Sequence, residues 1–169
     1  GGFKGSPLRK KGTVFWKRVR TMGKIIAVAN QKGGVGKTTT AVNLSAALGA
    51  KGKKTLLVDV DPQGNSSSGV GVDRRRVKQT MYEVLIGETP AQEARIHTEF
   101  ANLDLLPSSM DLAGAELELI EMEHRESILK NAIVPLRAEY DFILIDCPPS
   151  LGIITTNALC AVSYTHLTL

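Results

Sequence analysis

The chain has 169 residues, of which 43% are hydrophobic and 22% charged, a composition that predicts one globular domain of ordinary size. It excludes a disordered or collagen-like protein, and no apolar run approaches the roughly 18 residues of a membrane-spanning helix. Residues 1–22 hold seven basic and no acidic side chains, so the rest of the chain carries a net charge of −3. The overall charge of +4 therefore does not indicate a nucleic-acid-binding surface on the domain.

Only Cys147 and Cys160 are present, and since their spacing fits no zinc or haem motif, they predict a reducing environment.

The basic N-terminal segment lacks the apolar stretch of a secretory signal, and regular strand patterning begins only after Met22. We interpret residues 1–21 as non-native or disordered sequence that is excluded from fold reasoning. The alternative is a basic arm that touches DNA or anionic lipid.

Short apolar strands alternate with helical segments along the rest of the chain. The predicted strands cover residues 25–29, 55–58, 103–106 and 142–145. The predicted helices cover residues 38–50, 80–86, 110–122 and 126–138. A stretch rich in Gly, Ser, Pro and Asn at residues 61–71 predicts a loop. This alternation predicts parallel βαβ units in an α/β fold with a doubly wound, mostly parallel sheet.

A phosphate-binding loop is predicted between the first strand and the first helix, where the chain reads Lys-Gly-Gly-Val-Gly-Lys-Thr. Glycines let consecutive backbone N–H groups converge on phosphates, and the helix N-terminus adds partial positive charge. Lys37 would place its charge against the β- and γ-phosphates, and the Thr38 hydroxyl would ligate Mg²⁺. The candidate nucleotide-binding residues are Lys32, Gly33, Gly34, Val35, Gly36, Lys37, Thr38 and Thr39.

The loop departs from the usual G-x-x-x-x-G-K-[ST] pattern, because Gln31 stands at the first glycine and Lys32 precedes the remaining glycines. This is the deviant Walker A form, and the chain resembles the ParA/MinD family of P-loop ATPases. Three further stretches match the family in order and spacing, at residues 59–65, 112–119 and 143–152. The second of these is typical of Soj-type chromosomal ParA proteins. The resemblance runs from about residue 23 to 161 and implies a P-loop NTPase-like fold.

Three carboxylates follow predicted strands within these matching stretches. Asp146 ends an apolar strand, where a buried carboxylate is costly unless a cation or hydrogen bonds compensate it, so Mg²⁺ is its expected partner. Asp61 is assigned to orienting the attacking water, since phosphoryl transfer depends mainly on positioning and charge stabilisation. Asp59 either supports Mg²⁺ or only ends its strand, and both interpretations stay open. The predicted metal site is therefore Thr38, Asp59 and Asp146.

The resemblance implies an ATP- and Mg²⁺-dependent ATPase for chromosome or plasmid partitioning. In the family, ATP joins two subunits into a homodimer, and the extra lysine, here Lys32, reaches across to the partner's phosphates. Lys32, Lys37 and Asp61 are thus the implied catalytic residues. The dimer binds DNA non-specifically, and a ParB-like activator stimulates hydrolysis. The implied location is cytoplasmic and nucleoid-associated, without stable membrane insertion.

A MinD-like, membrane-associated division-site ATPase is the main alternative, but the Pro-Gln-Gly-Asn sequence at residues 62–65 favours ParA. A reductase component like the nitrogenase iron protein would need bridging cysteines that the sequence lacks. The basic run at residues 74–78 is either a solvated face or a contact for DNA phosphates or a partner.

The length of the chain adds a further alternative. ParA proteins are considerably longer, and residues 162–169 do not resemble the family. We interpret residues 22–161 as the N-terminal part of a ParA-like ATPase domain with a truncated sheet, and residues 162–169 as artefactual sequence. An inactive fragment remains an alternative to a working ATPase.

Overall fold

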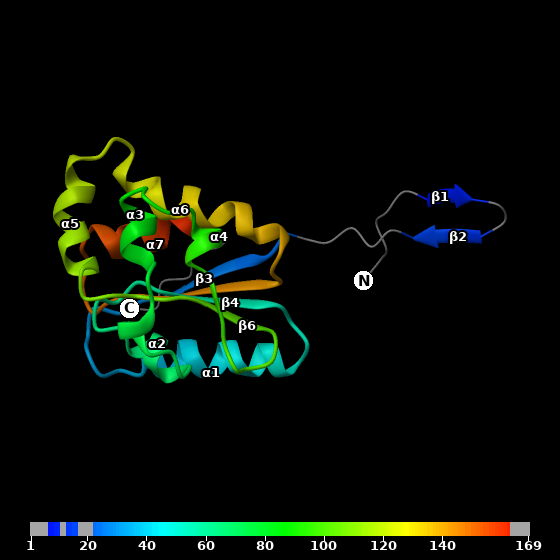
Figure 1. The fold of residues 1–169 in the computed structure, drawn as a ribbon, viewed down its shortest axis with the longest axis horizontal. Coiled ribbons are helices and arrows are strands. Elements are labelled where there is room, and N and C mark those ends of the chain that lie inside the picture. Colours follow the sequence, from blue (N-terminus) through cyan, green and yellow to red (C-terminus); the bar gives the residue numbers. More distant parts are fainter. Residues whose placement is uncertain (1–6, 11–12, 17–21, 163–169) are drawn as a thin grey trace.

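The computed structural model describes residues 7–10, 13–16 and 22–162. A five-stranded sheet forms its centre (Figure 1). Its strands, in spatial order, are β3 (Lys24–Val28), β7 (Phe142–Asp146), β4 (Thr55–Asp59), β6 (Leu103–Leu106) and β5 (Ile96–His97). The first four run parallel and β5 runs antiparallel to β6. The register pairs Asp146 with both Val28 and Asp59, so the carboxyl ends of the three strands lie at one edge of the sheet.

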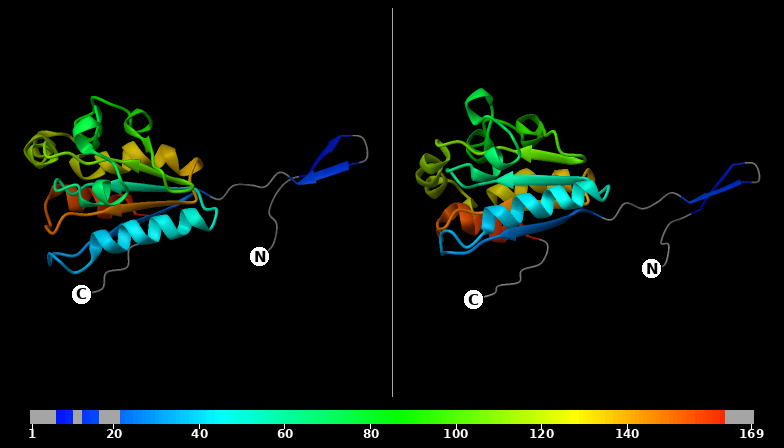
Figure 2. Two further views of the ribbon diagram at one scale, coloured as in Figure 1. Left: turned by 60° about the horizontal axis from the view of Figure 1, so that its bottom comes forward. Right: turned by 90° about the horizontal axis from the view of Figure 1, so that it is seen from below.

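Helices cover both faces of this sheet, which confirms the predicted doubly wound α/β fold. The helices are α1 (Lys37–Ala50), α2 (Asn65–Gly69), α3 (Met81–Leu85), α4 (Ala91–Ala94), α5 (Leu112–Glu121), α6 (Ile128–Ile133) and α7 (Ile153–Ala161). Helix α1 lies along one face with α2 beside it, and α3 to α7 lie on the opposite face (Figures 1 and 2). Within the described residues, no helix combines the length and apolar character needed to cross a bilayer.

The central strands are buried on both faces, which explains why they read as continuous apolar runs in the sequence. Leu56 and Ile143 belong to the core beneath α3 to α7. Leu57 and Leu144, one residue further along each strand, pack with Ala41 of α1 in the second core. The sheet is therefore fixed from both sides, and the loops at its carboxyl edge extend from a rigid base.

Several segments differ from the sequence-based prediction. The predicted loop at 61–71 contains α2, and β5, α4, α7 and a 3-10 turn, η1 (Arg74–Arg76), were not predicted. The helix predicted over 126–138 is divided into η2 (Arg125–Ser127), α6 and η3 (Val134–Ala138). Pro135 lies in the first turn of η3. Proline lacks an N–H group and its ring clashes with the preceding turn, so the regular helix ends before it.

Two short strands lie in the segment for which the sequence predicted no regular strands. They are β1 (Pro7–Lys10) and β2 (Thr13–Trp16), which pair antiparallel. The interpretation of residues 1–21 and 162–169 as non-native sequence stays a prediction. Residues 1–6, 11–12, 17–21 and 163–169 lie outside the described part of the chain.

Candidate nucleotide-binding site

The loop between β3 and α1 has the backbone geometry that its glycines predict. Gly34 and Gly36 have φ angles of 70° and 87°, in the left-handed region that favours glycine. Gly36 precedes α1 directly, and no side chain caps the helix there. The first-turn N–H groups of a helix have no partner within the helix, so those of α1 remain available to an anion. A Cβ added at Gly33 would meet no atom within 4 Å, so this part of the loop is open.

A cavity of about 370 Å³ lies over this loop at the carboxyl edge of the sheet. Ligands of open α/β sheets bind at this edge. Residues from three separate segments line it: Gly33, Gly34, Gly36, Lys37, Thr38, Thr39, Asp61, Gln63, Asn65 and Pro149. The fold therefore brings most of the predicted phosphate loop together with Asp61. Lys32 and Val35 are exposed and are not among the lining residues.

The two lysines of the loop have different surroundings. The Lys37 ammonium donates to the backbone carbonyl of Lys32 over 3.1 Å, within the loop itself. The backbone N–H of Lys32 donates to Oδ1 of Asn30 over 2.9 Å. Lys37 is thus held at the cavity, whereas Lys32 is exposed to solvent.

Asp146 lies at the end of β7 and is buried beside the first turn of α1. Its Oδ2 accepts hydrogen bonds from the Thr38 hydroxyl (2.8 Å) and the Ser66 hydroxyl (2.6 Å). Its Oδ1 is buried without a hydrogen-bond partner among the described residues. Burial raises the pKa of Asp146, while the hydrogen bonds from Ser66 and Thr38 lower it.

This arrangement fits Mg²⁺. A buried carboxylate oxygen without a partner, next to a threonine hydroxyl, is a donor set that a hard cation accepts. The described residues contain no group of three or more His, Cys, Asp or Glu side chains that could hold a metal. Mg²⁺ does not require such a cage, because it is usually bound by one or two carboxylates together with substrate phosphates and water. Thr38 and Asp146 are the residues here that would hold it.

Asp59 is buried at the end of β4, and its carboxylate accepts hydrogen bonds from the loop that follows and from α2. Oδ2 accepts from both the backbone N–H and the hydroxyl of Ser67, each at 2.7 Å, and Oδ1 accepts from the Asp61 N–H at 3.2 Å. Burial raises its pKa to about 7, opposed by the bonds from Ser67. Asp59 does not line the cavity and holds α2 against the strand end. Its contribution to a metal site stays a prediction.

Asp61 lines the cavity from the loop after β4. Its Oδ1 accepts from the Gln63 N–H at 2.9 Å. Its backbone carbonyl accepts from the Ser108 hydroxyl at 2.6 Å and from the Gly64 N–H at 2.8 Å. The carboxylate therefore sits on a tight turn that is anchored to the end of the neighbouring strand β6.

The sequence did not identify the serines that support these carboxylates. Ser66 and Ser67 fall in the predicted loop, where no periodicity marked a helix. Ser108 follows β6 and contacts both the Asp61 carbonyl and the Ser67 hydroxyl. The one feature of the sequence that could have identified Ser108 is its position at the carboxyl end of a parallel strand.

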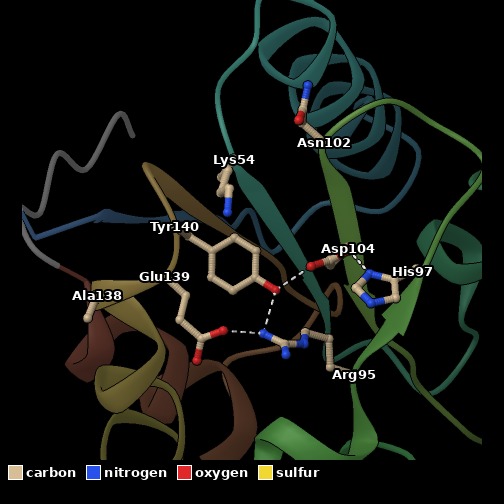
Figure 3. Close-up of a pocket in the computed structure, with 8 residues that line it drawn as sticks. All are labelled: Lys54, Arg95, His97, Asn102, Asp104, Ala138, Glu139 and Tyr140. Carbon is tan, nitrogen blue, oxygen red and sulfur yellow. Dashed lines mark hydrogen bonds and ion pairs between the residues drawn. The ribbon is translucent and has the colours of Figure 1, made fainter. Parts of the chain in front are cut away.

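A second cavity, of about 420 Å³, lies at the amino ends of β4, β6 and β7, the opposite edge from the phosphate loop (Figure 3). Its charged side chains bond to one another. Arg95 pairs with Glu139 at 2.6 Å and donates to the Tyr140 hydroxyl at 3.0 Å. The Tyr140 hydroxyl donates to Asp104, which also contacts His97 at 2.6 Å. This network joins the β5 edge to the segment before β7. No residue of the phosphate loop lines this cavity.

The chain resembles known proteins over most of its length. Residues 23–168 match the AAA domain family. The chromosome partitioning protein ParA of Myxococcus xanthus is 53% identical over 141 residues, which cover 83% of this chain and 50% of that protein. The sporulation initiation inhibitor protein Soj of Bacillus subtilis is 52% identical over 140 residues, which cover 83% of this chain and 55% of that protein. The chain thus spans about half the length of these curated relatives.

Solved structures share the fold as well. A crystal structure described as cobyrinic acid a,c-diamide synthase from Mycobacterium smegmatis, with bound ADP and magnesium, superposes with a TM-score of 0.81 at 45% identity. The superposition covers 83% of this chain and 57% of that one. The match over residues 23–168 establishes that this chain belongs to the AAA domain family, and its sequence is similar to those of the ParA and Soj proteins.

Proposed function

We propose that the protein carrying this chain binds and hydrolyses Mg²⁺-ATP to drive chromosome or plasmid partitioning. The observation that carries this proposal is the cavity in which the phosphate loop meets Asp61, with Asp146 hydrogen-bonded to Thr38 beneath it. The names of the ParA and Soj relatives and the ADP and magnesium of the Mycobacterium structure support it. The relative named for chromosome partitioning is 53% identical to this chain and the structure named as a synthase is 45% identical, so partitioning is the favoured role.

Each residue of the site has a physical role in this reaction. The glycine-loop amides and the first turn of α1 bind the phosphates, and Lys37 neutralises the charge of the β- and γ-phosphates. Thr38 and Asp146 would hold Mg²⁺, which supplies further charge neutralisation when bound. Asp61, anchored through Ser108, orients the attacking water. Asp59 shapes the site by fixing α2.

The finer parts of the proposal concern assembly. The exposed Lys32 reaches the phosphates of a second subunit in an ATP-dependent homodimer. The dimer binds DNA non-specifically, and a ParB-like activator stimulates hydrolysis. The protein acts in the cytoplasm, on the nucleoid.

A pair of lysine variants tests the proposal in the full-length protein that carries this sequence. Lys37→Ala should abolish ATP binding, because the loop loses the charge that faces the phosphates. Lys32→Ala should leave ATP binding to the monomer within about twofold and impair dimer formation and turnover. Titration with a fluorescent ATP analogue measures binding, and sedimentation with ATP measures dimerisation. Unchanged ATP binding in Lys37→Ala would overturn the proposed site, and normal dimerisation in Lys32→Ala would remove the role of Lys32.

A further inference from the structure

Three consecutive arginines form η1, and the first of them has a different partner from the other two. Asp73 caps this turn by accepting from the Arg75 N–H. Arg75 and Arg76 form ion pairs with the same Asp73, and their side chains are 89% and 88% exposed. Arg74 is only partly exposed and contacts the loop that follows β4.

The contact of Arg74 with this loop is close. Its Nη1 donates to the backbone carbonyl of Pro62 over 3.1 Å. The side chain also covers Gly64, which is buried and has a φ of 63°. A Cβ at position 64 would lie 2.5 Å from both Cδ and Cζ of Arg74 and closer still to Nη1. The backbone angle favours glycine here, and a Cβ would also displace the Arg74 side chain from its place over the loop.

The loop held in this way is the one that carries Asp61. Its turn is closed by the Gly64 N–H on the Asp61 carbonyl and by the Gln63 N–H on the Asp61 carboxylate. Ser108 fixes the loop from the β6 side. Arg74 fixes it at Pro62, from a different element of the chain. Asp61 therefore lies between two attachment points, and loss of either would let its carboxylate shift relative to the cavity.

We infer that Arg74 is a positioning residue for Asp61. It acts through Pro62 and Gly64 and does not line the cavity itself. The inference rests on the proposed function, because the consequence of a shifted Asp61 is slower ATP hydrolysis. A carboxylate that must orient a water loses effect steeply when it moves, whereas the phosphate cradle is unaffected. Arg74 thereby links the exposed basic turn to the hydrolytic step.

Amide hydrogen exchange in the nucleotide-free, full-length protein tests the positioning directly. Arg74→Met keeps an unbranched stem over Gly64 and removes the donors. Peptides that cover residues 62–66 should exchange about fivefold faster. This is the change in the local opening equilibrium that the loss of one net hydrogen bond is expected to cause. Arg76→Met is the matched control, since Arg76 lies in the same turn but is exposed and pairs with Asp73, and it should leave these peptides unchanged. Arg74→Lys, which keeps a charged donor, should restore part of the protection.

ATP turnover without DNA then tests the consequence. Arg74→Met should lower kcat about tenfold and leave the dissociation constant for ATP within about twofold. Equal exchange or equal kcat in Arg74→Met and the wild type would overturn the inference while the proposed function stands. A wild type that binds no ATP would overturn the proposed function, and this result is recognisable because Lys37→Ala and the wild type would then behave alike.

Discussion

The carboxylate of Asp146 is buried at the end of β7, where one oxygen accepts two hydroxyl hydrogen bonds and the other has no partner among the described residues. The sequence predicted this carboxylate and Thr38 from their positions after a strand and at the start of a helix. It did not predict Ser66, because a hydroxyl in a Ser-rich loop carries no pattern. The carboxylates and the residues of the phosphate loop were therefore predictable, and the serines that hydrogen-bond to the carboxylates were not.

Asp61→Ala tests the assignment of the water-orienting residue. The substitution removes the carboxylate but keeps the phosphate loop, Thr38 and Asp146, so ATP binding should persist and hydrolysis should fall by at least about 100-fold. The ATP-bound dimer should accumulate, and its DNA binding should weaken steeply as salt rises, as phosphate contacts do. Single-turnover ATP hydrolysis is the measurement, with DNA retention at two salt concentrations. A normal hydrolysis rate would exclude Asp61 from the mechanism.

The two cysteines should differ sharply in reactivity. Cys147 is buried next to Asp146, and burial raises the pKa of its thiol to about 12, so it holds almost no thiolate at pH 8. Cys160 is exposed on α7 and free. A chromogenic disulfide reagent should therefore label Cys160 quickly in the folded protein, and Cys147 only after denaturation. Equally fast labelling of the two would contradict the packed environment of Cys147.

Among the elements, those with a strong periodic or apolar pattern were predicted best. The strands at 55–59, 103–106 and 142–146 and helix α1 lie where the sequence placed them, within a residue or two. Helix α2 and strand β5 were missed because tertiary contacts, and no periodic pattern, hold them. Helix α2 contains only five residues and is held by hydrogen bonds from Ser67 to Asp59. Strand β5 contains two residues, and the network of Figure 3 adds side-chain contacts to its pairing with β6.

Tyr140→Phe tests that network. The variant removes a buried hydroxyl that donates to Asp104 and accepts from Arg95, so the free energy of unfolding should fall by about 1–2 kcal/mol. Tyr82→Phe is the matched control, because the Tyr82 hydroxyl bonds to Glu118 at an exposed site, and it should cost less than about 0.5 kcal/mol. Urea denaturation measures both. ATP affinity should not change in either variant, and equal destabilisation by the two would contradict a structural role for the network.

At the scale of the whole molecule, the five-stranded sheet carries the proposed nucleotide site at its carboxyl edge. The alternation of strands and helices predicted parallel βαβ units, and parallel strands bring their carboxyl ends together, so the meeting of the phosphate loop with Asp61 and Asp146 was predictable. The strand order was not, because β7 inserts between β3 and β4 and no local pattern specifies its neighbours. That insertion places Asp146 next to Thr38. The carboxyl edge therefore combines a local motif with a contact between residues 108 positions apart.

If this edge binds the phosphates of ATP, a crystal structure of the full-length protein with Mg²⁺ and a non-hydrolysable ATP analogue should show them there. We expect the β- and γ-phosphates within hydrogen-bond distance of the Gly33–Thr39 amides and of the Lys37 ammonium. We also expect Mg²⁺ between the phosphates and the Thr38 hydroxyl, on the side of Asp146. A nucleotide bound elsewhere, such as in the cavity beside Arg95 and Tyr140, or phosphates with no contact to Lys37, would contradict the proposed site.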